Sequence, residues 1–289
     1  MSETLLDESF AETAARSATP RRRRRILTAA ACAGLVAGLC VLAACLGDSG
    51  LATNLPARKT PPCFAHPFGT DWLGRDMFTR VVLGLRVSLG VGLAAAGSSA
   101  VISLILGAAA GIWGGKADAL VNGAVDLVMS MPHLVLLILV SFALGGGRQG
   151  VIIAVAVSHW PRLARIIRAE VMQLKHSDFV AVSKALGRGR AFIAARHMPP
   201  HVLPQFAVGL LLLFPHAIMH AAGLTFLGFG LSPHDPSIGV LLAESMRHLS
   251  TGYWWLAVIP GLALVCLVMV FDQLGASLRV LLDPKTRQE

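Results

Sequence analysis

Two histidines stand four residues apart in an apolar stretch in the last third of the chain. His216 and His220 occupy positions i and i+4, so a helix places both imidazoles on one face. Neutral imidazole is a common ligand of nickel, cobalt, copper and zinc, and Met219 and His133 are further candidate ligands. We therefore predict a transient metal site at His216 and His220 on a substrate path. In the alternative, both rings hydrogen-bond to a neighbouring helix or to water.

The elements that must position these side chains are membrane helices. Of the 289 residues, 55% are hydrophobic and only 14% are charged, and the mean hydropathy is +0.66. Such a composition is too apolar for a water-soluble domain. The sequence therefore predicts an all-α, polytopic membrane protein.

Runs without charged residues locate the membrane spans, because a spanning helix needs about 20 apolar residues. Five runs are long enough, and a shorter sixth run keeps helical periodicity beyond its end. The six predicted spans are residues 26–47, 87–115, 127–147, 149–161 with its helical continuation, 197–234 and 248–271. An outer loop around residues 232–252 is predicted between the last two spans.

Lys and Arg are distributed unevenly between the two faces that these spans define. Of the 25 basic residues, 18 fall on the face that holds both termini and 7 fall on the other. The positive-inside rule therefore places both termini in the cytoplasm. Topology thus explains the net charge of +9, and no basic domain is left for binding nucleic acid.

Motifs for chemistry on a substrate are missing from the sequence. It contains no nucleotide-binding P-loop, no HExxH and no GxSxG, so we predict that the chain is not an enzyme. It also has no carboxylate in the middle of a span, where proton- or sodium-driven transporters usually hold the coupling ion. Energy for transport must then come from a partner, with a secondary transporter or channel as the alternative.

A segment between the fourth and fifth spans has the features of a docking helix. Residues 178–187 read as a helix ended by Gly187, with Phe179, Val182 and Leu186 on one side. An apolar ridge of this kind, held outside the membrane, fits into a groove of a partner protein. The alternative is an amphipathic helix that lies on the lipid surface.

This segment, within a coupling loop at residues 169–200, resembles the EAA loop of ATP-binding-cassette (ABC) importer permeases. In those permeases the short helix sits in a cleft of the ATPase subunit and transmits its closure. One departure is Ala181, which stands where the family usually has glutamate. The resemblance assigns ATPase coupling to Phe179, Ala181, Val182, Ser183, Lys184, Ala185, Leu186 and Gly187.

A longer resemblance covers residues 66–284. The segments HPFGTDWLGRDMFTR (66–80), GLRVSL (84–89), SHWPRLARIIR (158–168) and TFLGFG (225–230) are similar to the "C" permeases of dipeptide, oligopeptide and nickel importers. The histidine-bearing run at 216–228 is more similar to the nickel-type permeases. The resemblance therefore implies a permease for nickel, cobalt or a metal–chelator complex. Dipeptides or oligopeptides are the alternative cargo.

Charged residues before the second span are predicted to form an extracytoplasmic lid. Asp71, Arg75 and Asp76 alternate in sign in a stretch where Gly69 and Gly74 permit turns. These charges can pair locally or with another subunit, and either pairing would fix the segment as a lid. The alternative is a solvated loop without partner contacts.

The resemblance also implies a fold and a set of partners. The fold is the MetI-like permease fold of type I ABC importers, with six transmembrane helices in a bacterial inner membrane. The partners are a second homologous permease subunit, two ATPases that bind ATP and magnesium, and an extracytoplasmic substrate-binding protein; this chain itself binds no cofactor. The implied organisation is a cytoplasmic tail (1–25), a first transmembrane helix (26–47), an extracytoplasmic segment (48–86), a five-helix permease core (87–284) and a cytoplasmic tail (285–289).

Overall fold

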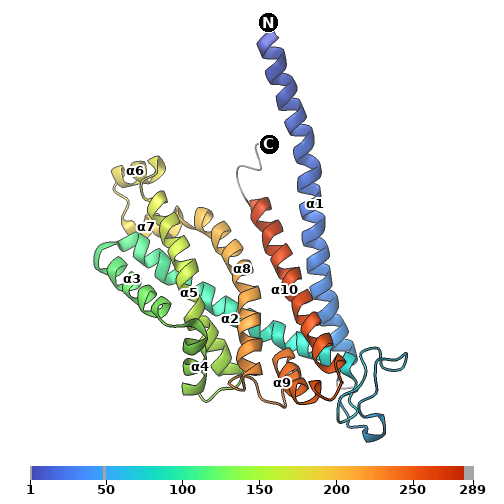
Figure 1. Cartoon of the computed structure of the whole chain (residues 1–289). Helices are drawn as coiled ribbons and strands as arrows, with labels where there is room; N and C mark the ends of the chain where they lie inside the picture. Colours follow the sequence, from blue (N-terminus) through green and yellow to red (C-terminus); the bar gives the residue numbers. More distant parts are fainter. Residues whose placement is uncertain (1, 48–49, 283–289) are drawn as a thin grey trace.

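The computed structural model describes residues 2–47 and 50–282, and most of this part of the chain is helical (Figure 1). The long helices are α1 (Ser2–Leu46), α2 (Met77–Trp113), α5 (Gly147–Leu174), α8 (Pro199–Phe226) and α10 (Trp255–Leu282). The short elements are the 3-10 helix η1 (Leu55–Ala57) and the helices α3 (Gly115–Ser130), α4 (His133–Ala143), α6 (Asp178–Ala185), α7 (Arg190–Arg196) and α9 (Ile238–Leu249). The predicted all-α class is confirmed.

The lengths and compositions of these helices agree with six spans. Five helices within the described residues are long and apolar enough to cross a bilayer, and the count is six if the bent pair of α3 and α4 is one span. The third span, predicted at 127–147, is therefore not one straight helix, because α3 and α4 meet at an angle of 99°. Pro132 explains the bend, since its ring disfavours a helical conformation of Met131, which has ψ 140°.

Helix α2 begins ten residues before the predicted start of the second span, at Met77 instead of residue 87. The predicted span starts after Arg86, the last charged residue before the apolar run, and Arg86 lies exposed within α2. Nearer the start of α2, Arg80 is buried and forms ion pairs with Asp71 and Glu244. A paired charge is compatible with a continuous helix, so α2 extends ten residues before the predicted span, whose own start stays a prediction.

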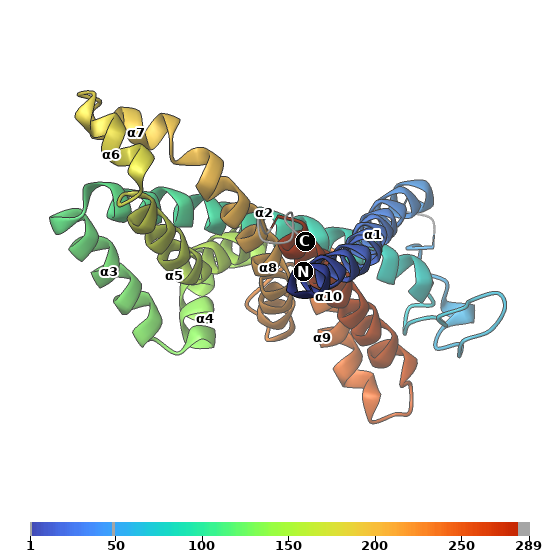
Figure 2. The same cartoon turned by 90° about the horizontal axis from the view of Figure 1, so that it is seen from above.

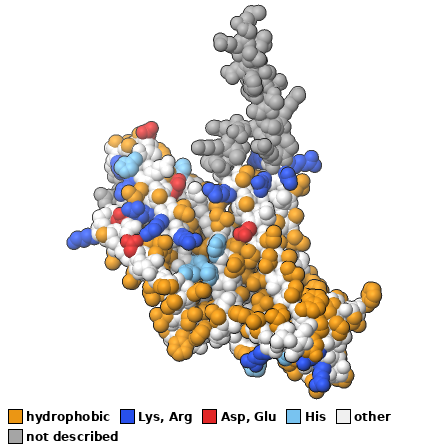
Figure 3. All heavy atoms as spheres, in the orientation of Figure 1, with side chains coloured by type: hydrophobic (Ala, Val, Ile, Leu, Met, Phe, Trp, Pro, Cys, Tyr) orange, Lys and Arg blue, Asp and Glu red, His pale blue; other side chains and the backbone are white. Residues whose placement is uncertain are grey.

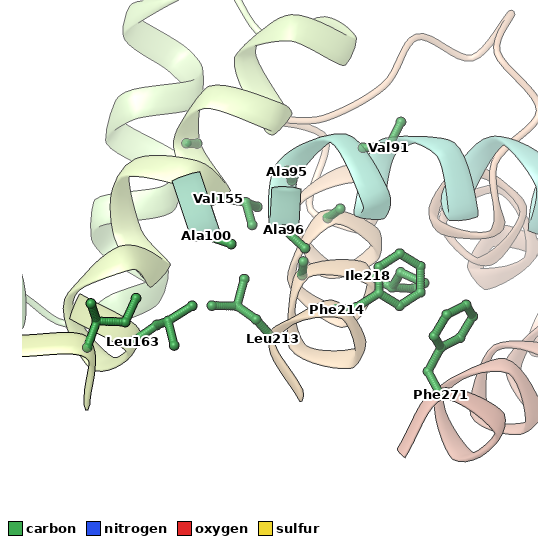
Figure 4. Packing of buried hydrophobic residues seen from close by; sticks show 14 of the residues in the cluster. Val91, Ala95, Ala96, Ala100, Val155, Leu163, Leu213, Phe214, Ile218 and Phe271 are labelled. Carbon is green, nitrogen blue, oxygen red and sulfur yellow. The ribbon is translucent and has the colours of Figure 1, made fainter. Parts of the chain in front are cut away.

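The core lies where α2 crosses α5 and α8 (Figures 2 and 4). Small residues allow this close approach: a Cβ atom on Gly107 would lie 2.5 Å from the carbonyl oxygen of Ala164. Helix α10 joins the core through Phe271, whose ring centroid lies 4.0 Å from that of Phe214 in α8. Because lipid is as apolar as these side chains, tight packing between helices, not exclusion of water, holds this region together.

Helix α1 runs beside α10 at the edge of the bundle (Figures 1 and 2). The hydroxyl groups of Thr28 and Ser277 lie 3.0 Å apart and link the two helices. Only 11% of the membrane window of α1 is buried, so most of its described surface faces away from the other helices. Helix α1 thus joins the described part of the predicted tail (1–25) to most of the predicted first span (26–47) at the periphery.

The outer loop predicted at residues 232–252 contains a helix, α9. Ser237 caps its first turn by accepting a hydrogen bond from the backbone N–H of Val240, and Ile238 is fully buried. A Cβ atom on Gly239 would lie 2.6 Å from the carbonyl oxygen of Ala222, so α9 packs tightly on α8. The prediction missed this helix because its twelve residues are too few to span a membrane and include charges.

Candidate functional site

Three histidines from three helices meet on one side of the bundle. His133 begins α4, His159 lies near the middle of α5, and His220 lies near the end of α8. Their ring centroids are 4.6, 4.5 and 5.0 Å apart. One nitrogen of each ring lies within 4.8 Å of a nitrogen of the other two. We call these three residues the histidine cluster.

The histidine cluster is partly exposed in the described structure. Figure 3 shows histidine side chains gathered on one face of the molecule, between an apolar surface and a group of Lys and Arg side chains. The three residues of the cluster are each partly exposed, although Nε2 of His133 itself is buried.

Hydrogen bonds limit which ring nitrogens can bind a ligand. The Nδ1 atom of His159 lies 3.0 Å from the carbonyl oxygen of Val155 and 2.9 Å from the hydroxyl of Ser158. When Nδ1 donates to the carbonyl, the lone pair of this ring is on Nε2; when Nδ1 accepts from Ser158, Nε2 carries the proton. The Nε2 atom of His133 is buried and has no hydrogen-bond partner among the residues that the structure describes. Buried polar atoms are nearly always satisfied, so an unpartnered one in a cluster of imidazoles indicates a position for a ligand.

Three imidazoles on one side of an ion supply half of an octahedral shell. Imidazole suits nickel, copper, zinc and iron, and metal–nitrogen distances are about 2 Å. The three nitrogens lie within 4.8 Å of one another, so binding one ion at such distances requires the rings to move closer together. The other side of the ion stays open for water or a chelator.

The predicted path residues divide into two groups. His133 and His220 belong to the histidine cluster, whereas His216 and Met219 do not. The Nδ1 atom of His216 lies 3.2 Å from the carbonyl oxygen of Leu212, and the side chains of His216 and Met219 are exposed. A role of His216 and Met219 in contacting substrate stays a prediction.

His159 is the residue that sequence reasoning missed. It lies about 60 residues before the His216–His220 pair, and no helical spacing connects positions on different helices. The available signal was a histidine inside a 13-residue charge-free run, two residues before Pro161. Only the packing of α4, α5 and α8 turns three separate histidines into a cluster.

The coupling loop has the exposed apolar ridge that its sequence predicts. Phe179, Val182 and Leu186 are 39%, 59% and 75% exposed, while Val180 on the opposite side is fully buried. Gly187, with φ 77°, ends the helix. Its N–H donates to the carbonyl of Lys184, and the next N–H donates to the carbonyl of Ser183, which is a Schellman motif.

The remaining predicted coupling residues lie on the same short helix. Ala181, Lys184 and Ala185 are exposed, and Ser183 is buried, with its hydroxyl 3.4 Å from Nε2 of His197. The ring of Phe179 stacks on that of His201, with centroids 5.4 Å apart. One side of α6 is therefore held by the chain, and Phe179 of the ridge also contacts His201, while Val182 and Leu186 are largely exposed.

The extracytoplasmic charges pair within the chain. Asp71 is fully buried, and its Oδ2 accepts hydrogen bonds from Arg75 Nε (2.6 Å) and Arg80 Nη1 (2.7 Å). Arg80 Nη2 donates to Glu244 Oε2 at 2.7 Å, which joins the segment to α2 and α9. We call Asp71, Arg75, Arg80 and Glu244 the outer charge network. Local pairing, one of the two predicted outcomes, is thus observed.

Asp76 has a different task from the other predicted lid charges. It caps α2, because its Oδ2 accepts a hydrogen bond from the N–H of Thr79 at 2.9 Å, and its Oδ1 lies 3.0 Å from Nδ1 of His66. The turn before it needs glycine: Gly74 has φ 74°, and a Cβ atom there would lie 1.8 Å from the carbonyl oxygen of Asn54. These contacts fix the segment's position, and its action as a lid stays a prediction.

Residues 103–288 match the family described as "Binding-protein-dependent transport system inner membrane component". The chain belongs to this family. A putative peptide transport system permease protein of Brucella abortus is 38% identical over 82% of this permease and 80% of the relative. The nickel transport system permease protein NikC of Escherichia coli is 35% identical over 81% and 84%, and the dipeptide permease DppC of Bacillus subtilis is 34% identical over 81% and 73%.

Solved structures show the same fold. A chain of the MetNI methionine ABC transporter aligns with a TM-score of 0.57 at 19% identity, over 72% of the permease and 98% of that chain. An amino acid ABC transporter chain aligns with a TM-score of 0.54 at 16% identity. The permease is therefore a multi-pass inner-membrane subunit of an ABC importer and not an enzyme. Its family implies ATPase and substrate-binding partners.

Proposed function

We propose that the permease forms half of a translocation path for nickel, cobalt or a metal–chelator complex. The single observation that supports this proposal is the convergence of three partly exposed histidines, His133, His159 and His220, from three helices. Their neutral imidazoles attract a transition-metal ion without adding charge that would hold it too tightly. A path needs binding that is favourable enough for entry and weak enough for exit.

The alternative cargo is a dipeptide or oligopeptide. This alternative is supported by relatives named for peptide transport, which are as similar to the permease as the nickel relative is. A peptide carries charged termini, for which carboxylates and basic side chains are better partners than neutral imidazoles. The side-chain chemistry of the histidine cluster therefore favours metal over peptide.

The proposed energy source is a pair of cytoplasmic ATPases that dock on α6. The ridge of Phe179, Val182 and Leu186 fits a groove of an ATPase subunit, and closure of the ATPases on ATP and magnesium would move α6 as a rigid body. This movement would tilt α5 and α8 and change which side of the path is open. In this arrangement both termini and α6 are cytoplasmic.

The proposed transport unit contains a second, homologous permease subunit and an extracytoplasmic binding protein. The second permease would supply the other half of the path opposite the exposed side of the histidine cluster. The outer charge network would hold residues 50–76 as a lid at the entrance. A secondary transporter or channel instead predicts uptake by the isolated chain that an ionophore abolishes.

The test of this function compares cargoes in cells that produce the complete importer. Radioactive nickel, a nickel–chelator complex and a labelled dipeptide are offered separately, with a strain that lacks the permease as the control. We expect permease-dependent uptake of nickel in free or chelated form. Permease-dependent uptake of the dipeptide alone would refute the metal proposal and support the peptide alternative.

A further inference from the structure

Each member of the histidine cluster has a proline close to it on its own helix or at its helix boundary. The pairs are Pro132 with His133, Pro161 with His159, and Pro215 with His220. Proline removes a backbone hydrogen bond and is a common cause of helix bending. The three imidazoles are thus placed beside the points where their helices bend most easily.

The prolines of α5 and α8 lie between the cluster and the coupling loop. Helix α5 passes His159 and then Pro161 before it enters the loop, and α8 leaves the loop and passes Pro215 before it reaches His220. A displacement of α6 is therefore transmitted to both histidines through a bendable position. Helices α5 and α8 join the coupling loop at opposite ends. A displacement of α6 can therefore move the rings of His159 and His220 in different directions.

The other ends of these helices are tied together. The hydroxyl of Ser141, in α4, donates to the carbonyl of Phe229 at 2.7 Å, and the N–H of Gly147 donates to the carbonyl of Gly230 at 3.0 Å. Helix α4 also packs closely on α5, where a Cβ atom on Gly150 would lie 3.2 Å from atoms of Ser141. With one end fixed, movement of the loop must be absorbed along the helices, in the region of the prolines and histidines.

We infer that His133, His159 and His220 form a three-histidine site that binds a divalent transition-metal ion directly, and that movement of the coupling loop changes its geometry. The Nε2 atom of His133 lacks a hydrogen-bond partner among the described residues and can bind an ion directly. When Nδ1 of His159 donates to the carbonyl of Val155, that contact orients the ring and leaves Nε2 to bind the same ion. The inference rests on the proposed function. It adds which side chains bind the ion and which movement changes their affinity for it.

The first experiment measures cobalt binding to the purified complete importer. Cobalt chloride is titrated by equilibrium dialysis, and the visible absorption of bound cobalt reports nitrogen ligands. We expect His159→Ala to weaken binding at least about 100-fold, because even outer-shell partners of metal ligands are worth about 10- to 100-fold. His159→Asn, which is closer in size and polarity, keeps the complex testable if the alanine variant fails to assemble.

The matched control is His234→Ala, which removes an exposed histidine outside the cluster. Its cobalt affinity should equal that of the unmodified importer. Equal affinity of the His159 variants and the His234 variant would overturn the site. Loss of binding in the His159 variants alone, in complexes that remain assembled, would support it.

The second experiment tests the link to the coupling loop. Cobalt affinity is compared with and without a non-hydrolysable ATP analogue and magnesium, in the unmodified importer and in Pro215→Ala. We expect the analogue to change the affinity at least about tenfold, and Pro215→Ala to reduce that change while cobalt still binds. An affinity that the analogue leaves unchanged in the unmodified importer would overturn the link.

These outcomes separate the inference from the proposed function. An importer that takes up nickel but whose cobalt affinity is insensitive to the His159 variants refutes the site and leaves metal transport standing. An importer that binds cobalt through the cluster but takes up only the dipeptide refutes metal transport and leaves the site standing.

Discussion

The outer charge network and the histidine cluster both place polar side chains in a largely apolar molecule, but they differ in how these side chains are satisfied. In the network, the buried carboxylate of Asp71 has two arginine partners, and Arg80 also pairs with Glu244. In the cluster, Nε2 of His133 has no hydrogen-bond partner within residues 2–47 and 50–282. Polar side chains with all their hydrogen-bond and ion-pair partners stabilise the fold. A polar atom that lacks a partner leaves a position for a ligand.

The largest expected effect is the loss of stability when the outer charge network is broken. Asp71→Ala leaves Arg80 buried without its main partner, and removing one member of a buried ion pair costs about 3 to 5 kcal/mol. We expect little assembled importer and a clearly lower melting temperature of what remains. Melting of the purified complex checks this, and an unchanged melting temperature would mean that the network does not fasten the outer segment.

The next largest effect concerns nickel uptake by variants of the histidine cluster. His220→Ala should reduce nickel uptake about 10- to 100-fold in assembled importer, because it removes a proposed ligand. His216→Ala should reduce uptake less, because the Nδ1 atom of His216 is already bonded to Leu212 and its ring lies outside the cluster. Uptake rates of the two variants at equal protein levels test this order, and a larger loss from His216→Ala would favour the histidine pair over the cluster.

A third prediction concerns the exposed ridge of the coupling loop. Leu186→Asp should weaken association with the ATPases at least about tenfold, because docking would bury a carboxylate in an apolar groove. Leu186 is 75% exposed, so the membrane helices should stay folded. Co-purification of the ATPases measures the effect, with Leu186→Met as the matched control. Equal co-purification of both variants would place the docking site elsewhere.

The smallest effect is expected at an exposed ion pair. Arg148 and Asp235 are separated by 3.4 Å, and their side chains are 54% and 40% exposed. Arg148→Ala should therefore change the free energy of unfolding by less than about 1 kcal/mol. A melting temperature lowered as much as in Asp71→Ala would show that burial does not explain the strength of the outer charge network.

Composition and charge-free runs were enough to predict the helical class, and the six predicted spans agree with the five or six that the helices allow. They did not predict features that depend on local interactions. Helix α2 extends back past Arg86 to Met77, α3 and α4 bend at Pro132, and α9 forms in a segment too short to span a membrane. Each of these depends on contacts between segments that are distant in the sequence or on a single bend.

The parts of the candidate site that lie on a single helix were predictable from the sequence. The ridge of Phe179, Val182 and Leu186 follows from helical spacing, and its exposure is observed. The histidine cluster does not follow from spacing, because His133 and His159 come from two other helices. The i, i+4 pattern identified His220 but paired it with His216 instead of with the histidines across the helix interface.

The most direct test of the central claim uses the complete importer reconstituted in lipid vesicles. Nickel uptake per ATP hydrolysed is measured for the unmodified protein, for a variant with His133, His159 and His220 replaced by alanine, and for His234→Ala. We predict that the triple variant assembles and hydrolyses ATP but imports nickel no faster than vesicles without ATP, while His234→Ala imports normally. Nickel import by the triple variant at the unmodified rate would contradict the account.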